Sequence, residues 1–474
     1  MKNLLKILFF GGFLLILFSC AQRETQQPDS ISQKLDAYLD AHVANNQFNG
    51  NVLISKGDSV VYFRSLGMAD RAFGIPNDDS TKFLIGSITK PFTAYGILLL
   101  AQQGKLSLKD RLSTYFPDFP HADRITIEQL LTHRSGLTDY HAFPDWKAKS
   151  KGDITPQQTL DQVAEKPLIF EPGSKFSYTN TGYIFLGLII EQVSGRSFEA
   201  FMQQEVIIPL GLKYTGVASN EQVIPHLAEG YTTNPRETQK ADYINYRQPY
   251  ASGNMYSTPW DLWKFTQAVM NHTLLPSETT ERIFNNSVYG YGWGIRTFDR
   301  VKAYGHHGGM NGFTGSITFL PEEAYFICFL TNDDNTPNYT LSEDLVSMVM
   351  NKPVALPLPE KLIPLTPDMK HLVVGKYHKG TIDEDSECNL IRERDFLTVS
   401  EENNKLYLQE TGQPRHELFP IDSNRYALTL LEFHAVFCDV DSGRSQTLKF
   451  EGRSNVVARR LKLFKVPADL LNSN

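Results

Sequence analysis

Strand-like stretches on either side of a long, mainly helical region constrain the fold of this chain more than any other feature. Residues 50–67 contain two apolar runs around Lys56-Gly57-Asp58, a pattern typical of a β-hairpin. Residues 316–331 contain two more apolar runs, whereas the pattern from Lys105 to about Asn245 is mainly helical. Strands connected as hairpins pair antiparallel. We therefore expect an α+β fold, in which an antiparallel sheet flanked by helices is built from both ends and an all-helical domain is inserted between them.

A proline-rich stretch divides the chain. With 474 residues, the chain is too long for one compact domain. Five prolines fall between positions 353 and 367, and beyond them apolar and polar residues alternate. We predict a main domain over residues 33–352, a linker over residues 353–370, and a small β domain, barrel or sandwich, over residues 371–474.

The N-terminus has the pattern of a targeting segment. Lys2 and Lys6 make its start basic, and Ile7–Phe18 is an apolar run that is too short to span a bilayer comfortably. Residues 1–20 are therefore predicted to be a signal peptide.

The end of that segment indicates lipidation. Leu17-Phe18-Ser19-Cys20 resembles a bacterial lipobox, whose cysteine becomes the lipidated first residue of the mature protein. An ordinary signal peptide with a chance cysteine is the alternative. Gln22, two positions after Cys20, resembles outer-membrane sorting in Gram-negative lipoproteins, and residues 21–32 are predicted to be a polar tether. We expect a periplasmic protein of the bacterial cell envelope, anchored by lipid in the outer membrane.

Charge and cysteine content bear on possible partners. A net charge of −7 gives no reason to expect nucleic-acid binding, and no Cys/His spacing is typical of a metal site. Cys328 lies in an apolar run and is predicted to be a buried core residue. Cys388 and Cys438 share the C-terminal region, where an oxidising compartment permits a disulfide that the sequence alone does not establish.

The strongest chemical signal is Ser-x-x-Lys at Ser87 and Lys90, at the start of a helical pattern that ends near Gly104. Residues three apart lie on one helix face, so we expect both side chains to point the same way, opposite the apolar stripe. A serine hydroxyl is a poor nucleophile until another group takes its proton, and the helix N-terminus and Lys90 both favour an alkoxide. The alternative is a helix-capping serine beside a solvated lysine.

Two further motifs strengthen the catalytic interpretation. Tyr178-Thr179-Asn180 precedes an apolar helix; Tyr243-Ile244-Asn245 repeats the pattern, but the first copy follows a tight turn and is preferred. Lys90 is expected to lower the pKa of Tyr178 so that the phenol can act as a base. The alternative for this pair is a buried tyrosine and a capping asparagine.

The third motif is the glycine-rich stretch Gly305–Phe313, which includes His306 and His307. Its glycines let a backbone approach a substrate closely, and one of its N–H groups and that of Ser87 are candidate donors of an oxyanion hole. A glycine-rich hairpin that carries surface histidines is the alternative.

Together the three motifs resemble serine hydrolases of the β-lactamase and penicillin-binding-protein superfamily, most closely the branch of class C β-lactamases, D-alanyl-D-alanine carboxypeptidases and esterases. That branch carries Ser-x-x-Lys, Tyr-x-Asn and Lys/His-x-Gly in this order. The resemblance runs from about residue 35 to 350 and includes Leu130–Leu137 and Tyr289–Trp293. Val374-Gly375-Lys376-Tyr377 looks like the start of the lipocalin-like β-barrel often appended to these proteins.

The resemblance implies a role for each motif residue. Ser87 is the acylated nucleophile, Lys90 and Tyr178 share the proton relay, and the backbones of Ser87 and Gly309 form the oxyanion hole. The positions implied to bind substrate are Asn180, His306, Gly308 and Gly309. His306 departs from the lysine of class C β-lactamases, and a histidine is only partly charged at pH 7, so recognition of a β-lactam carboxylate is expected to be weak.

The sequence thus predicts a serine hydrolase that cleaves an amide or ester bond, in a D-amino-acid peptide or a small acyl ester, through an acyl-enzyme on Ser87. No metal or organic cofactor is implied, and nothing in the sequence bears on the oligomeric state. The alternative is a catalytically silent protein that binds penicillin or cell-wall peptides. The intact set of Ser87, Lys90 and Tyr178 argues against it.

Overall fold

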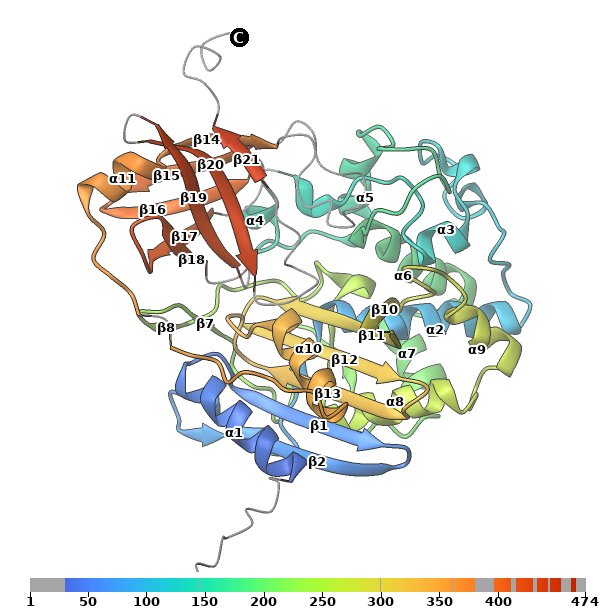
Figure 1. Cartoon of the computed structure of the whole chain (residues 1–474). Coiled ribbons are helices and arrows are strands. Elements are labelled where there is room, and N and C mark those ends of the chain that lie inside the picture. Colours follow the sequence, from blue (N-terminus) through green and yellow to red (C-terminus); the bar gives the residue numbers. More distant parts are fainter. Residues whose placement is uncertain are drawn as a thin grey trace, which may run out of the picture.

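A six-stranded antiparallel sheet organises the main part of the protein (Figure 1), with strand order β10-β11-β12-β13-β1-β2. The computed structural model describes residues 30–143, 145–298, 300–359, 361–379, 396–410, 415–428, 433–441, 444–452 and 462–465. The strands of the sheet are β1 (Gly50–Lys56), β2 (Ser59–Leu66), β10 (Gly294–Phe298), β11 (Val301–Met310), β12 (Phe313–Leu320) and β13 (Tyr325–Thr331). Gly50 of β1 lies opposite Thr331 of β13, so the sheet joins both ends of the region, as predicted.

Helices cover both faces of this sheet. On one face α1 (Ile31–Ala44) and α10 (Asn338–Val349) pack on Val52, Ile54 and Ile327 (Figure 1). On the other face α8 (Pro259–Met270) lies against β1 and β13. Ser30 caps α1 by accepting a hydrogen bond from the Gln33 N–H, so the helix begins before the predicted domain boundary at residue 33.

The inserted region is built around α2 (Thr89–Gln102) and α6 (Asn180–Ser194), which pack against each other. Residues 89–100 of α2 are all buried, so this stretch has no exposed face. The sequence had instead indicated a single apolar stripe with Ser87 and Lys90 opposite it. Gly195, with φ +70°, ends α6 where predicted. The other helices of the main domain are α3 (Ile127–Leu131), α4 (Trp146–Lys149), α5 (Pro156–Ala164), α7 (Phe198–Met202) and α9 (Ser277–Ile283).

The region that follows α7 is less helical than the sequence indicated. A π-helical turn covers Gln203–Ile207, and residues 208–258 form turns and short strands. The short strands of the main domain are β3 (Met68–Asp70), β4 (Ile75–Pro76), β5 (Phe83–Leu84), β6 (Gly216–Val217), β7 (Tyr231–Thr233), β8 (Thr238–Lys240) and β9 (Met255–Ser257). Many are too short for periodicity to reveal.

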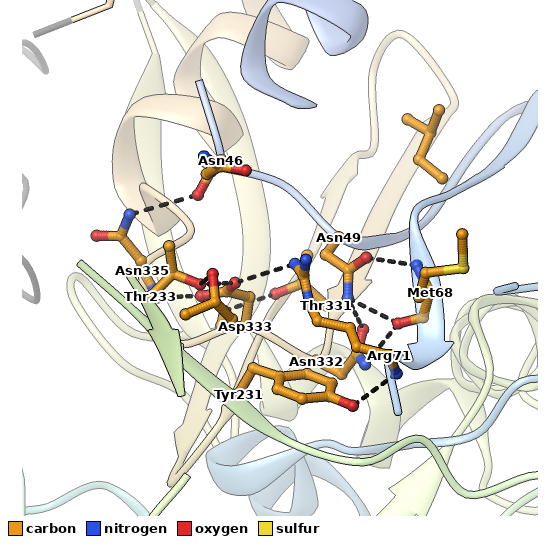
Figure 2. Close-up of polar contacts among 12 residues, drawn as sticks. Asn46, Asn49, Met68, Arg71, Tyr231, Thr233, Thr331, Asn332, Asp333 and Asn335 are labelled. Atoms are coloured by element: carbon orange, nitrogen blue, oxygen red, sulfur yellow. Dashed lines mark hydrogen bonds and ion pairs between the residues drawn. The ribbon is translucent and has the colours of Figure 1, made fainter. Parts of the chain in front are cut away.

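A buried polar network ties these short strands to the sheet (Figure 2). Asn332, directly after β13, donates from Nδ2 to the carbonyl oxygen of Met68 at 3.0 Å. The same Nδ2 donates to the carbonyl oxygen of Glu229 at 2.8 Å. Its Oδ1 accepts from Asn49 Nδ2 at 2.7 Å. Because buried amide groups are costly without partners, these paired contacts fix the end of the sheet against β3 and the residues just before β7.

The C-terminal part forms a closed antiparallel barrel, in which β14 pairs with both β15 and β21. Its strands are β14 (Gly375–Lys379), β15 (Phe396–Glu402), β16 (Lys405–Glu410), β17 (Arg415–Pro420), β18 (Arg425–Leu428), β19 (Phe433–Asp441), β20 (Arg444–Gly452) and β21 (Lys462–Lys465). The helix α11 (Pro367–Val373) occupies the end of the predicted linker, because Pro367 suits the first turn and Met369 packs into the barrel.

Candidate active site

Ser87 lies in a 3₁₀ turn, Gly86–Ile88, that leads directly into α2. Gly86 has φ +49°, and a Cβ on it would lie only 2.6 Å from the carbonyl oxygen of Gly309. Glycine therefore permits both the left-handed backbone and the close approach of this turn to strand β11. The turn places Ser87 between the N-terminus of α2 and the sheet.

Lys90 is completely buried beneath Ser87. Its Nζ donates to Ser87 Oγ at 3.0 Å, to Asn180 Oδ1 at 2.8 Å and to the carbonyl oxygen of Ser252 at 2.9 Å. Burial lowers the pKa of this amine to about 7, against the opposing effect of Asp139. The full positive charge expected from the sequence is therefore reduced, and near neutral pH the amine is poised to accept a proton from Ser87.

Tyr178 faces the same amine, with Lys90 Nζ 4.9 Å from the centre of its ring. Although 39% of the side chain is exposed, crowding by protein atoms raises the pKa of the phenol well above its usual value. A contact with the Ser87 hydroxyl acts in the opposite direction but does not prevail. The expected lowering of this pKa by Lys90 is therefore wrong, because the sequence does not reveal how crowded the phenol is.

Asn180 is the first residue of α6, and Thr179, not Asn180, caps that helix. The Asn180 Nδ2 donates to Asp139 Oδ2 at 3.2 Å, and the Asn180 backbone N–H donates to the same oxygen at 2.6 Å. Because its Oδ1 accepts from Lys90, both ends of the amide are engaged. Asn180 therefore holds Lys90 in place and connects it to the carboxylate of Asp139.

The glycine-rich stretch Gly305–Phe313 covers the end of strand β11 and the turn into β12. β11 pairs with β10 as far as Gly305, which lies opposite Gly294. β11 also contacts the turn that carries Ser87, and residues 306–310 border this turn. A Cβ on Gly308 would lie 2.0 Å from the carbonyl oxygen of Ile85, which requires glycine there. The position of a Cβ on Gly309 is open, with no atom of the described residues within 4 Å.

His306 is buried, with both ring nitrogens engaged. Its Nδ1 lies 2.6 Å from the His307 carbonyl oxygen, and its Nε2 lies 2.9 Å from the Tyr289 hydroxyl. A carbonyl only accepts, so Nδ1 carries the proton and Nε2 accepts from Tyr289; this tautomer is assigned from the contacts. Burial lowers the pKa of His306 to about 3. The partial charge at pH 7 that the sequence indicated is therefore wrong.

The second Tyr-x-Asn copy lies in another setting. Tyr243 is 55% exposed, and Asn245 bonds with its backbone to the Ser150 carbonyl and with Nδ2 to the Gly152 carbonyl. The preferred copy, at Tyr178, is therefore the one that the fold brings to Ser87.

Several residues of the site were not singled out from the sequence. Asp139 and Ser252 contact Asn180 and Lys90, whereas His133 and Tyr289 pack beside Tyr178. Two of them could have been found from the sequence, because His133 and Tyr289 lie in stretches that already carried the family resemblance.

Some sequence-based predictions concern residues outside those that the structure describes, namely the signal peptide with Cys20, most of the tether, and Cys388. Cys328 is fully buried, as expected. Within the described ranges, no helix is both long and apolar enough to cross a membrane. No cluster of three or more potential metal-ligating His, Cys, Asp or Glu side chains occurs in the same ranges.

This chain belongs to the β-lactamase family, whose model, described as Beta-lactamase, matches residues 35–346. It is 28% identical over 447 residues to penicillin-binding protein 4* of Bacillus subtilis (strain 168), covering 88% of this chain and 96% of that one. It is 27% identical over 309 residues to teichoic acid D-alanine hydrolase of Staphylococcus aureus, covering 63% and 73%. The structure of D-amino acid amidase from Ochrobactrum anthropi SV3, complexed with L-phenylalanine amide, aligns with a TM-score of 0.57 at 25% identity, covering 64% and 92%.

These matches confirm the family inferred from the sequence motifs. The fold is that of the β-lactamase family, and the chain is similar to serine hydrolases of that family.

Proposed function

We propose that this protein is a serine hydrolase that cleaves an amide or ester bond through an acyl-enzyme on Ser87. The observation that carries the proposal is the 3.0 Å contact between Lys90 Nζ and Ser87 Oγ, made by an amine whose pKa burial lowers to about 7. A neutral amine at that distance can take the serine proton as Oγ attacks the acyl carbon. A fully solvated lysine would remain protonated near pH 7.

In the proposed reaction, the Ser87 Oγ–acyl bond forms and the bond to the leaving amine or alcohol breaks. The proton taken by Lys90 passes to the leaving group, with the Tyr178 hydroxyl as the relay. The N–H groups of Ser87 and Gly309 stabilise the oxyanion, because the Gly86 turn lies against Gly309. Water then attacks the acyl-enzyme, giving the free acid and restoring Ser87.

The proposed substrate is a D-amino-acid peptide or a small acyl ester. Two relatives support this, one named a teichoic acid D-alanine hydrolase and one a D-amino acid amidase. The neutral His306 also supports it, because a residue without charge attracts a substrate carboxylate less than a lysine would. Hydrolysis of β-lactams is accordingly expected to be weak.

Covalent labelling tests the proposal most directly. A fluorophosphonate probe should add to the protein, peptide mapping should place the adduct on Ser87, and Ser87→Ala should lose both the adduct and all turnover. The substrate panel consists of D-Ala-D-Ala peptides, D-alanyl esters, D-amino acid amides, p-nitrophenyl acetate and nitrocefin. An adduct on another serine, or turnover by Ser87→Ala, contradicts the proposal. Penicillin binding without turnover of any substrate indicates the silent binding protein instead.

We also propose that the protein is anchored by lipid on Cys20 in the cell envelope, on the outer membrane. The basic start, the short apolar run and the Leu-Phe-Ser-Cys ending support this. Cys20→Ala should leave the protein unprocessed or release it into the soluble fraction. Unchanged membrane fractionation of that variant contradicts lipidation.

A further inference from the structure

His133 brackets Tyr178 with two hydrogen bonds. Its carbonyl oxygen accepts from the Ser177 N–H at 3.0 Å, and its Nδ1 accepts from the Thr179 N–H at 3.2 Å. The residues on both sides of Tyr178 are therefore held by one residue from a distant part of the chain. His133 lies just after α3 and has φ +55°, a left-handed conformation that is uncommon for residues other than glycine.

The ring of His133 also packs directly against the ring of Tyr178, with their centres 4.3 Å apart. On its other sides the imidazole lies 4.4 Å from the ring centre of Tyr289 and 5.2 Å from that of Tyr183. The ring therefore restricts the phenol from behind, while the two hydrogen bonds fix the backbone from which the phenol extends. Such packing limits the rotamers open to Tyr178.

The chemistry of His133 is poorly explained by packing alone. Because Nδ1 accepts a backbone N–H, the neutral ring must carry its proton on Nε2, and no hydrogen-bond partner for this buried Nε2 exists among the described residues. A phenylalanine ring would fill the space without burying an unpaired donor. Burial, with Lys90 and His306 nearby, lowers the pKa of His133 and keeps Nδ1 free to accept.

We propose that His133 is a positioning residue that holds the Tyr178 hydroxyl beside Ser87 and Lys90. This inference rests on the proposed function, because it assigns His133 a part in the same proton relay. His133 touches neither substrate nor reacting atoms in that scheme; it acts through Tyr178. The Nδ1 acceptor is the essential feature, because of the two hydrogen bonds it makes the one that depends on the side chain.

Two substitutions separate the acceptor from the ring. His133→Asn keeps an oxygen acceptor near the Nδ1 position and tolerates the left-handed backbone, whereas His133→Phe keeps a ring and removes the acceptor. We expect His133→Phe to lower kcat per labelled active site at least tenfold with KM within twofold, and His133→Asn to recover most of that loss. His42→Phe in α1, an equally buried histidine outside the site, is the control and should leave kcat per active site unchanged.

A double-mutant cycle tests the path of the effect. In the Tyr178→Phe background the hydroxyl is absent, so His133→Phe should change kcat less than twofold. A purely structural role predicts equal fold-losses of total activity in both backgrounds, caused by fewer labelled sites, with kcat per labelled site unchanged. If His133→Phe does not fold, His133→Ala replaces it in the same comparison with His133→Asn. Equal kcat values for the acceptor-free and Asn variants overturn the inference.

Amide exchange gives a readout independent of activity. Exchange of the peptide covering residues 177–179 should be faster in His133→Phe than in His133→Asn, because only the former leaves the Thr179 N–H unpaired. If the probe fails to label Ser87 but exchange responds as expected, the proposed function is wrong, whereas the hydrogen bonding of His133 around Tyr178 is supported. If Ser87 is labelled but neither kcat nor exchange responds to His133→Phe, the positioning role of His133 is wrong and the proposed function is unaffected.

Discussion

The helix side and the strand side of the candidate site each present a buried nitrogen group to Tyr178, and the two groups differ in charge. On the helix side, Lys90 is surrounded by three oxygen acceptors and has a pKa of about 7. On the strand side, His306 is paired with a carbonyl and a phenol, both neutral, and its pKa is about 3. Of these two groups, only Lys90, which lies beside Ser87, titrates near neutral pH.

The difference arises from what surrounds each group. Burial penalises the charged form of both, but Asp139 partly offsets this for Lys90, whereas Lys90 itself further disfavours a charge on His306. A positive charge on Lys90 thus disfavours a positive charge on His306. The comparison teaches that proton transfer belongs to the helix side, and that the strand side offers a neutral surface to the substrate.

Removal of the amine should have the largest effect. Lys90→Met keeps much of the side-chain length but removes the base and leaves the Asn180 and Ser252 oxygens without this donor. We expect kcat/KM to fall by about 10²–10⁴-fold, the usual range for a general base. Lys82→Met is the matched control, because Lys82 is also buried and its pKa is also lowered by burial. Equal losses in both variants would refute the special role of the helix side.

The phenol comes next. Tyr178→Phe removes the relay hydroxyl but leaves Lys90 as the base, so we expect a loss of about 10²-fold, at the low end of the same range, with little change in KM. The pH dependence of kcat/KM should keep its position, because it belongs to the amine. Tyr243→Phe, in the second Tyr-x-Asn copy, serves as control. A loss in Tyr243→Phe but not in Tyr178→Phe would show that the wrong copy was chosen.

The pH profile tests the comparison without a mutation. The proposed base works as the free amine, so kcat/KM should rise with pH, reach half its plateau near pH 7 and fall about tenfold per unit below that. The folded pKa is depressed from its usual value of 10.5. The stability that Lys90 contributes is therefore present above pH 10.5 and is lost as the pH falls through about 7. A profile limb near pH 10 would contradict this assignment.

Local patterns predicted strands β1, β2, β12 and β13, the pairing of Ser87 with Lys90 and the start of α6, because each depends on residues close in sequence. The surroundings of the site were harder to predict from the sequence. His133 contacts Thr179 across 46 positions, and no periodicity marks such a contact. The pKa directions of Lys90, Tyr178 and His306 follow from burial that only the assembled fold creates.

The smallest expected effect concerns the strand side and substrate choice. His306→Gln keeps a neutral side chain that can accept from Tyr289, so the ratio of kcat/KM for nitrocefin to that for p-nitrophenyl acetate should stay within about twofold. His306→Lys places an ammonium group there, which should raise this ratio about tenfold, since a charge-assisted contact to a carboxylate adds about 1.5–3 kcal/mol at most.

The lysine variant carries an internal check on this last prediction. A second ammonium near Lys90 disfavours the charged form of both, so the profile limb should move below pH 7 in His306→Lys and stay in place in His306→Gln. A changed ratio with an unmoved limb would mean that the new lysine points away from the site. Efficient nitrocefin turnover by the parent protein would show that a neutral strand side does not limit recognition of carboxylates, and the contrast between the two sides would then concern proton transfer alone.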